Sequence, residues 1–205
     1  KPDFIHLKEL SADIKVNPEN ICRNQDLNIT NNTIGSTSSI WDFGDGSGSS
    51  DFNPIKSYSQ LGKYTISYIA SYNSICYDTI FKEVQVDSIK ADFVASSNYV
   101  CQLPYEIAYV DKSVHAVSWN WKFGNGTVSP EQNPLVTIDR SLLLDKTNSL
   151  YLSDTLIVTS EFGCSDEIHI DSNIHISVPI VYFTPNNSII YSDEIGGCAP
   201  LTINF

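Results

Sequence analysis

The sequence is poor in features that several classes of protein need. It has no methionine, and 24 Asp and Glu outnumber 12 Lys and Arg, which gives a formal net charge of −12 at pH 7. Such a surface repels phosphate backbones, and no basic cluster offsets the repulsion, so we expect no nucleic-acid binding. The longest apolar run, residues 178–183, contains Pro179 and is far shorter than the ~20 residues of a membrane helix. We therefore expect no membrane insertion in this segment.

A sustained helical pattern is also missing, and the residues that are abundant favour strands. The best helical candidate, residues 141–152, is short and is interrupted by Lys146, Thr147 and Asn148. The 11 Tyr residues, together with many Thr, Ser, Ile and Val, are typical of β-strands. The sequence therefore predicts an all-β protein.

The sequence repeats itself with a period near 80 residues. Residues 41–47 (WDFGDGS) recur at 121–127 (WKFGNGT), and residues 53–54 (NP) recur at 133–134 with the same offset. A period of this length, with turn signals between short alternating segments, is typical of a seven-stranded β-sandwich rather than a helical solenoid or a propeller blade. We predict tandem sandwiches of about seven strands each.

The repeat also predicts the domain boundaries. Residues 12–87 form one repeat, and residues 88–177 form a second that carries an insertion near 138–150. Residues 1–11 are expected to be the last strand of a preceding repeat, and residues 178–205 the beginning of a following one. Because the chain starts with Lys-Pro-Asp, without an initiator Met or a signal peptide, we expect a processed chain or a piece of a longer array.

Five cysteines occupy matching places in the repeats. Cys22 and Cys101 each follow an opening strand, and Cys76 and Cys164 each follow a later strand and a tight turn. The repeat therefore predicts one disulfide within each copy, Cys22 with Cys76 and Cys101 with Cys164, while Cys198 has its partner beyond residue 205. Such bonds persist in oxidising compartments, which favours an extracellular location. The zinc alternative lacks any Cys-x-x-Cys or His-rich spacing.

The first copy closely resembles the PKD domain, an immunoglobulin-like β-sandwich. The resemblance rests on residues 41–46 (WDFGDG), on residues 53–54, and on the Tyr-x-x-x-Gly-x-Tyr element formed by Tyr58, Gly62 and Tyr64. It implies immunoglobulin-like sandwiches that are non-catalytic.

The second copy resembles the family less closely. It keeps Trp121, Phe123 and both glycines of the motif, but Asn125 replaces an Asp, and the Tyr-x-x-x-Gly-x-Tyr element is absent where the insertion falls. The added Cys pair and residues 197–202 (GCAPLT) resemble PKD arrays in very large surface proteins of Bacteroidota. Such proteins are commonly exported by the type IX route and include gliding-motility adhesins, so the resemblance implies a cell-surface protein with a role in cell adhesion.

Two aspartates of the first motif are weak candidates for calcium binding. Asp42 and Asp45, with Ser47 and Asp51, could offer oxygen ligands. The spacing is not that of an EF-hand loop, and the second copy has Lys122 and Asn125 in place of the two leading aspartates. We therefore favour a turn-forming role, expect no cofactor, and keep calcium as the alternative.

Two rows of aromatic residues alternate with polar ones. Trp41 and Phe43 share one strand face, as do Trp119, Trp121 and Phe123. Exposed aromatic rows can stack on sugars, but a sandwich core needs the same bulk, and the alternation favours the core.

No motif indicates catalysis. Glycine-elbow serine, zinc-protease and phosphate-loop patterns are all absent. His169 and His175 are six residues apart on one strand, about 20 Å, which is too far for one metal ion, so we predict that both lie on a solvent face. Asp-Ser/Thr-aliphatic triplets mark Thr79, Ser88 and Thr155 as candidates for O-glycosylation.

The leading hypothesis is a structural spacer in an extracellular, cell-surface adhesin or filament, whose partners are neighbouring repeats of the same polypeptide. The alternative is a carbohydrate- or protein-binding module of a secreted multidomain protein, with glycans or other surface proteins as partners. Sugar binding would require an exposed flat row of tyrosines such as Tyr68, Tyr72 and Tyr77. An enzyme is not expected, because nothing in the sequence brings titratable groups together.

Overall fold

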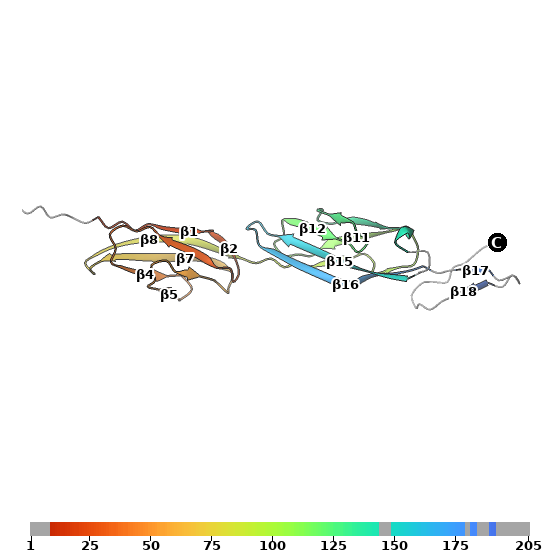
Figure 1. Cartoon of the computed structure of the whole chain (residues 1–205), viewed down its shortest axis with the longest axis horizontal. Helices are drawn as coiled ribbons and strands as arrows, with labels where there is room; N and C mark the ends of the chain where they lie inside the picture. Colours follow the sequence, from red (N-terminus) through yellow and green to blue (C-terminus); the bar gives the residue numbers. More distant parts are fainter. Residues whose placement is uncertain (1–8, 144–148, 179–180, 184–188, 192–205) are drawn as a thin grey trace, which may run out of the picture. The chain divides into compact units, whose positions relative to one another are not determined.

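The computed structural model describes residues 9–143, 149–178, 181–183 and 189–191 (Figure 1). Over these residues the chain is built of strands, and one short 3-10 turn, η1 (Arg140–Leu142), is the only helix. The predicted all-β fold is therefore confirmed. The chain divides into two compact units, Lys1–Ser88 with Phe162–Cys164, and Ile89–Glu161 with Ser165–Phe205.

The first unit packs a five-stranded sheet against a three-stranded one. Strand β2 pairs in parallel with the C-terminal end of β8, and all other pairs are antiparallel. The larger sheet has the order β2 (Asn20–Cys22), β8 (Cys76–Asp87), β7 (Gly62–Tyr72), β4 (Ser38–Asp42) and β5 (Gly48–Ser49). The smaller sheet has the order β1 (Ile14–Asn17), β3 (Leu27–Asn31) and β6 (Ile55–Lys56).

The second unit repeats this plan. Strand β10 pairs in parallel with the C-terminal end of β16, as β2 does with β8. The larger sheet has the order β10 (Tyr99–Val100), β16 (Ser165–Ser177), β15 (Ser149–Thr159), β12 (Ser118–Lys122) and β13 (Val128–Ser129). The smaller sheet has the order β14 (Leu135–Ile138), β11 (Tyr105–Asp111) and β9 (Phe93–Ala95).

Alternating strands place one hydrophobic core inside each unit. Strand β3, for example, alternates buried and exposed residues along its whole length, as a strand with one face in a core must. Trp41 and Trp121 occupy equivalent central places, at 2% and 0% exposed. Phe43 and Phe123 are buried beside them, so the predicted core role of these aromatics is confirmed, while Trp119 packs only partly buried against the second core.

Several sequence predictions fall outside the part of the chain that the structure describes. The predicted leading strand over residues 1–11 is described only from residue 9, and the insertion near 138–150 only outside 144–148. Beyond residue 178, the described residues form a two-stranded sheet of β17 (Val181–Phe183) and β18 (Ile189–Tyr191). Cys198 lies outside the described residues. No helix in the described ranges is long and apolar enough to cross a membrane.

Candidate functional site

The motif residues after β4 build a turn. The Trp41 indole Nε1 donates to the carbonyl of Asp51 at 2.8 Å, and the backbone N–H of Gly44 donates to Asp42 Oδ1 at 2.8 Å. Gly44 has a φ of +76°, and a Cβ there would lie 2.7 Å from the carbonyl oxygen of Thr65, so this place requires glycine. The Asp42 carboxylate thus serves the turn that the sequence predicts.

Asp45, the second weak calcium candidate, has a cationic partner from the protein itself. Its carboxylate lies 2.5 Å from Lys56 Nζ and accepts from the hydroxyl of Ser47 at 2.6 Å. Partial desolvation alone would raise the pKa of Asp45, but the hydrogen bonds from Lys56 and Ser47 lower it to about 2. The ammonium group of Lys56 is thus the cation that this carboxylate contacts. Among the described residues, no three His, Cys, Asp or Glu side chains gather in a way that could hold a metal ion.

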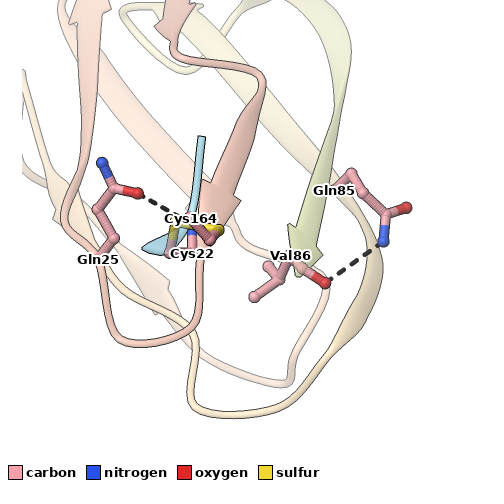
Figure 2. The surroundings of a disulfide bond; sticks show 5 residues. All are labelled: Cys22, Gln25, Gln85, Val86 and Cys164. Atoms are coloured by element: carbon pink, nitrogen blue, oxygen red, sulfur yellow. Dashed lines mark hydrogen bonds between the residues drawn. A yellow bond between two sulfur atoms is a disulfide. The ribbon is translucent and has the colours of Figure 1, made fainter. Parts of the chain in front are cut away.

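The cysteines are paired differently from the prediction. Cys22 is bonded to Cys164, at a sequence separation of 142, and Cys76 is exposed with a free thiol (Figure 2). Cys101 is in a disulfide as well, and its partner is not Cys164. The predicted bonds Cys22–Cys76 and Cys101–Cys164 are therefore wrong.

The parallel pairing of β2 with β8 explains this correction. Cys22 lies opposite Asp87 at the end of β8, whereas Cys76 is the first residue of that 12-residue strand. At about 3.3 Å per residue, the two cysteines are about 35 Å apart, while a disulfide needs Cα atoms within about 7 Å. The same pairing places Cys101 and Cys164 near opposite ends of β16. Each repeat therefore carries its two cysteines at opposite ends of its sandwich.

The bond joins two segments that are far apart in the sequence but belong to one compact unit. Phe162–Cys164 is part of the connection between β15 and β16, and its contacts place it with the first unit, while both strands belong to the second. Cys164 is 3% exposed. Figure 2 shows the pair beside Gln25, whose Oε1 accepts from the backbone N–H of Cys22 at 2.9 Å.

A buried carboxylate in the second unit was missed by the sequence reasoning. Asp154 is 1% exposed and accepts three hydrogen bonds, from Tyr109 Oη at 2.7 Å, Asn173 Nδ2 at 2.8 Å and the backbone N–H of Gly124 at 3.0 Å. Burial and the bond to Asp154 raise the pKa of Tyr109 above its usual range. The signal was available in the sequence, because Asp154 is in phase with the inward-facing Leu152, Leu156 and Val158.

The two histidines have partners on their own sheet. His169 is half-exposed and contacts the hydroxyl of Thr155 at 2.7 Å and the carboxylate of Asp171 at 3.0 Å. His175 contacts the hydroxyl of Ser149 at 2.9 Å and stacks on Tyr151 with ring centroids 4.1 Å apart. Thr155, His169 and Asp171 thus form a hydrogen-bonded chain whose His and Asp side chains are 49% and 89% exposed.

The remaining candidates differ in exposure. Thr79 is exposed on β8, Ser88 is partly buried, and the hydroxyl of Thr155 is engaged by His169. The tyrosine row that sugar binding would require does not form: Tyr68 is fully buried and packs against Trp41 with ring centroids 4.2 Å apart, whereas Tyr77 is 62% exposed.

The comparisons with known proteins reveal similarity of fold. No family model matches the chain, and no curated protein matches it. The PKD1 domain of the Vibrio cholerae metalloprotease PrtV is 22% identical, with a TM-score of 0.35, over 38% of this chain and 98% of that one. The PKD1 domain of Vibrio anguillarum Epp is 24% identical, with a TM-score of 0.34, over 38% and 93%. The fibronectin(III)-like modules of Clostridium thermocellum CbhA are 10% identical, with a TM-score of 0.42, over 81% and 94%.

Proposed function

We propose that this chain is a non-catalytic spacer of an extracellular surface protein, made of PKD-type repeats over residues 12–87 and 88–177. The observation that carries the proposal is the Cys22–Cys164 disulfide. A stable disulfide favours an oxidising, extracytoplasmic location, since cytosolic reductants keep thiols reduced. A spacer between a cell surface and a distal adhesive region would bear tension along the chain, and this bond changes how the chain transmits it.

The Cys22–Cys164 bond lets tension bypass the part of the chain between these two residues. Force applied to the two ends travels through covalent bonds, so it passes from Cys22 directly to Cys164, at a sequence separation of 142, and does not stretch the loop between them. That loop contains the central tryptophan of each core, Trp41 and Trp121, whereas β1 and β16, which complete the two sandwiches, lie outside it. Even if the packing of both units were lost, the loop could not lengthen. A spacer with this bond can therefore lengthen under load only through the residues outside the loop.

Pulling on single molecules tests the proposal. With handles at both termini, the oxidised chain should extend only through the residues outside the loop. Adding a reductant should release about 500 Å more contour length, because an extended residue spans at most about 3.6 Å. Because Cys101 is in a disulfide as well, the double variant Cys22→Ser, Cys101→Ser should show the longer extension without any reductant.

Cys76→Ser is the matched control, because it removes a thiol that is free in this chain. It should extend like the unchanged protein, with and without reductant. Equal contour lengths for the oxidised and reduced unchanged protein would contradict the proposed mechanical role.

The sugar-binding alternative has lost the feature that would have supported it, because Tyr68 is buried and Tyr77 stands apart from it on the surface. We therefore propose no glycan site. The O-glycosylation candidates stay predictions, and of these Thr79 is the most accessible. Peptide mass spectrometry of the natively secreted protein would find a sugar there.

A further inference from the structure

The free thiol of Cys76 occupies the same place in the first repeat as the bonded Cys164 in the second. Tyr72 pairs with Cys76 across a turn of three residues, and in the second repeat three turn residues, 161–163, directly precede Cys164. Cys76 is exposed, whereas Cys164 is 3% exposed and bonded to Cys22. The hairpin-turn cysteine of the second repeat, Cys164, is thus bonded to Cys22, the cysteine that follows the opening strand of the first repeat. We call a cysteine in that place of a repeat a Cys22-type cysteine, and one in the place of Cys76 or Cys164 a Cys76-type cysteine. Cys76 itself is unbonded.

The partner of Cys76 cannot be the Cys22 of its own repeat. These two residues lie at opposite ends of β8, about 35 Å apart. A Cys22-type cysteine therefore reaches a Cys76-type cysteine only when the two belong to different repeats, as Cys22 and Cys164 do.

The turn that leads to Cys164 and the turn that leads to Cys76 can be compared by the apolar residues that each presents. Beside Cys22 is a recess of about 260 Å³, and Phe162 of the bonded turn forms part of its wall together with residues of β2, β7 and β8: Asn20, Lys63, Glu83, Val84 and Gln85. The turn that carries Cys76 presents apolar side chains to solvent, with Ile75 78% exposed and Tyr77 62% exposed. Ile75 is thus an apolar residue of the Cys76 turn, as Phe162 is of the bonded turn.

We propose that Cys76 forms a disulfide with the Cys22-type cysteine of another repeat of this kind, placed before residue 12 in the same array. The inference rests on the proposed spacer function and extends it, because it makes the inter-repeat bond a recurring connection. In the reaction, the two thiols form one S–S bond and give two electrons and two protons to a disulfide oxidant. Oxidised glutathione can accept them and is reduced to two glutathione thiols.

A lengthened chain tests this inference. A second copy of residues 12–90 is inserted between Ser11 and Ala12, so that Lys90 of the added copy precedes Ala12 as Lys90 precedes Ala91 in the natural sequence. Arg23→Lys in the added copy gives its Cys22 peptide a distinct mass. The protein is oxidised in glutathione buffer, its free thiols are alkylated, and its peptides are mapped without reduction.

The expected map links Cys22 of the added copy to Cys76 of the original one, keeps the Cys22–Cys164 bond, and leaves the added copy's Cys76 as the alkylated thiol. Alkylation of the original Cys76, or a covalent dimer through Cys76 of two molecules, would overturn the inference. In the matched control, Cys22→Ser in the added copy alone should restore alkylation of the original Cys76.

A variant of the 205-residue chain provides a second test if the lengthened protein does not fold. Cys164→Ser releases Cys22, so concentrated protein in glutathione buffer should form head-to-tail oligomers linked Cys22 to Cys76. The double variant Cys76→Ser, Cys164→Ser should remain monomeric. Oligomers linked only Cys76 to Cys76 would overturn the inference. The pulling experiment uses the Cys22–Cys164 bond alone, so failure of one proposal is distinguishable from failure of the other.

Discussion

The first and second repeats share a hydrogen-bonded frame but differ in how each holds the turn after its central Trp strand. In both, an Asn side chain accepts from the backbone of the smaller sheet: Asn53 from the N–H of Asn31, and Asn133 from the N–H of Asp111, each at 2.9 Å. Trp41 and Trp121 each donate to a backbone carbonyl at 2.8 Å. The frame survives although many of the surrounding residues differ.

The turn itself is held by carboxylates in different places. In the first repeat, the N–H of Gly44 donates to the exposed Asp42. The second repeat has Lys122 at that position, and the N–H of Gly124 donates instead to the buried Asp154. One repeat thus holds its turn from the surface, and the other holds it from the core.

The buried carboxylate replaces an apolar residue of the first core. Asp154 occupies in β15 the place of Ile66 in β7, which is fully buried. A buried carboxylate without partners would be costly, and Tyr109, Asn173 and Gly124 supply the three donors that it needs. The second core thus depends on a polar network at this position, whereas the first core depends on the packing of an apolar side chain.

The largest effect is expected when the second core receives the residue of the first. Asp154→Ile removes the acceptor of the buried Tyr109 hydroxyl and of two partly buried donors, on Asn173 and Gly124, so it should lower the free energy of unfolding by about 3 kcal/mol or more. The loss should appear in peptides of the second repeat when unfolding is followed by hydrogen exchange and mass spectrometry.

Asp171→Ala is the matched control, because it removes a carboxylate whose side chain is 89% exposed. It should cost less than about 1 kcal/mol. Equal effects of the two substitutions would mean that the network around Asp154 does not stabilise the second core.

The same contrast shows how far the sequence could predict this structure. The alternation of apolar residues and the motif around Trp41 and Trp121 were enough for the all-β fold and the aromatic cores, because burial follows directly from strand periodicity. The turn-forming use of Asp42 was also predictable, since Asp side chains accept from backbone N–H groups two residues on.

The disulfide could not be predicted from the order of the cysteines. Its pairing depends on the parallel contact of β2 with β8, which puts Cys22 and Cys76 at opposite ends of one sandwich, and parallel pairing leaves no local mark in the sequence. Asp154 was missed for a different reason. Its inward phase was readable, but its donors come from Tyr109 and Asn173, which only the folded chain brings together.

A smaller effect is expected from the tyrosine that distinguishes the first repeat. Tyr58 is 1% exposed, and its hydroxyl donates to the carbonyl of Phe43 at 2.9 Å, whereas the second repeat has the buried Ile138 at this place. Tyr58→Phe should lower the free energy of unfolding of the first repeat by about 1 kcal/mol, since it removes one buried hydrogen bond.

Tyr64→Phe, which removes an exposed hydrogen bond to the carbonyl of Gln60, is the control and should lower the free energy of unfolding by less in the same denaturant titration. If Tyr58→Phe has no effect, the tyrosine contributes packing alone.

The smallest effect concerns the ion pair that the first repeat has and the second lacks. The pKa of Asp45 is lowered from 3.8 to about 2, so its pairing with Lys56 stabilises the fold above about pH 4 and is lost as the pH falls toward 2. Asp45→Asn should therefore cost up to about 1 kcal/mol at pH 7, as exposed pairs do, and nothing near pH 2. The reciprocal variant Asn125→Asp should bring no gain, because Asn125 Nδ2 donates to the carbonyl of Thr137 and an aspartate would lose that bond. Urea titrations of both variants at pH 7 and pH 2 would measure these changes in the free energy of unfolding. If Asp45→Asn lowers the free energy of unfolding equally at both pH values, the carboxylate acts through the turn rather than through its charge.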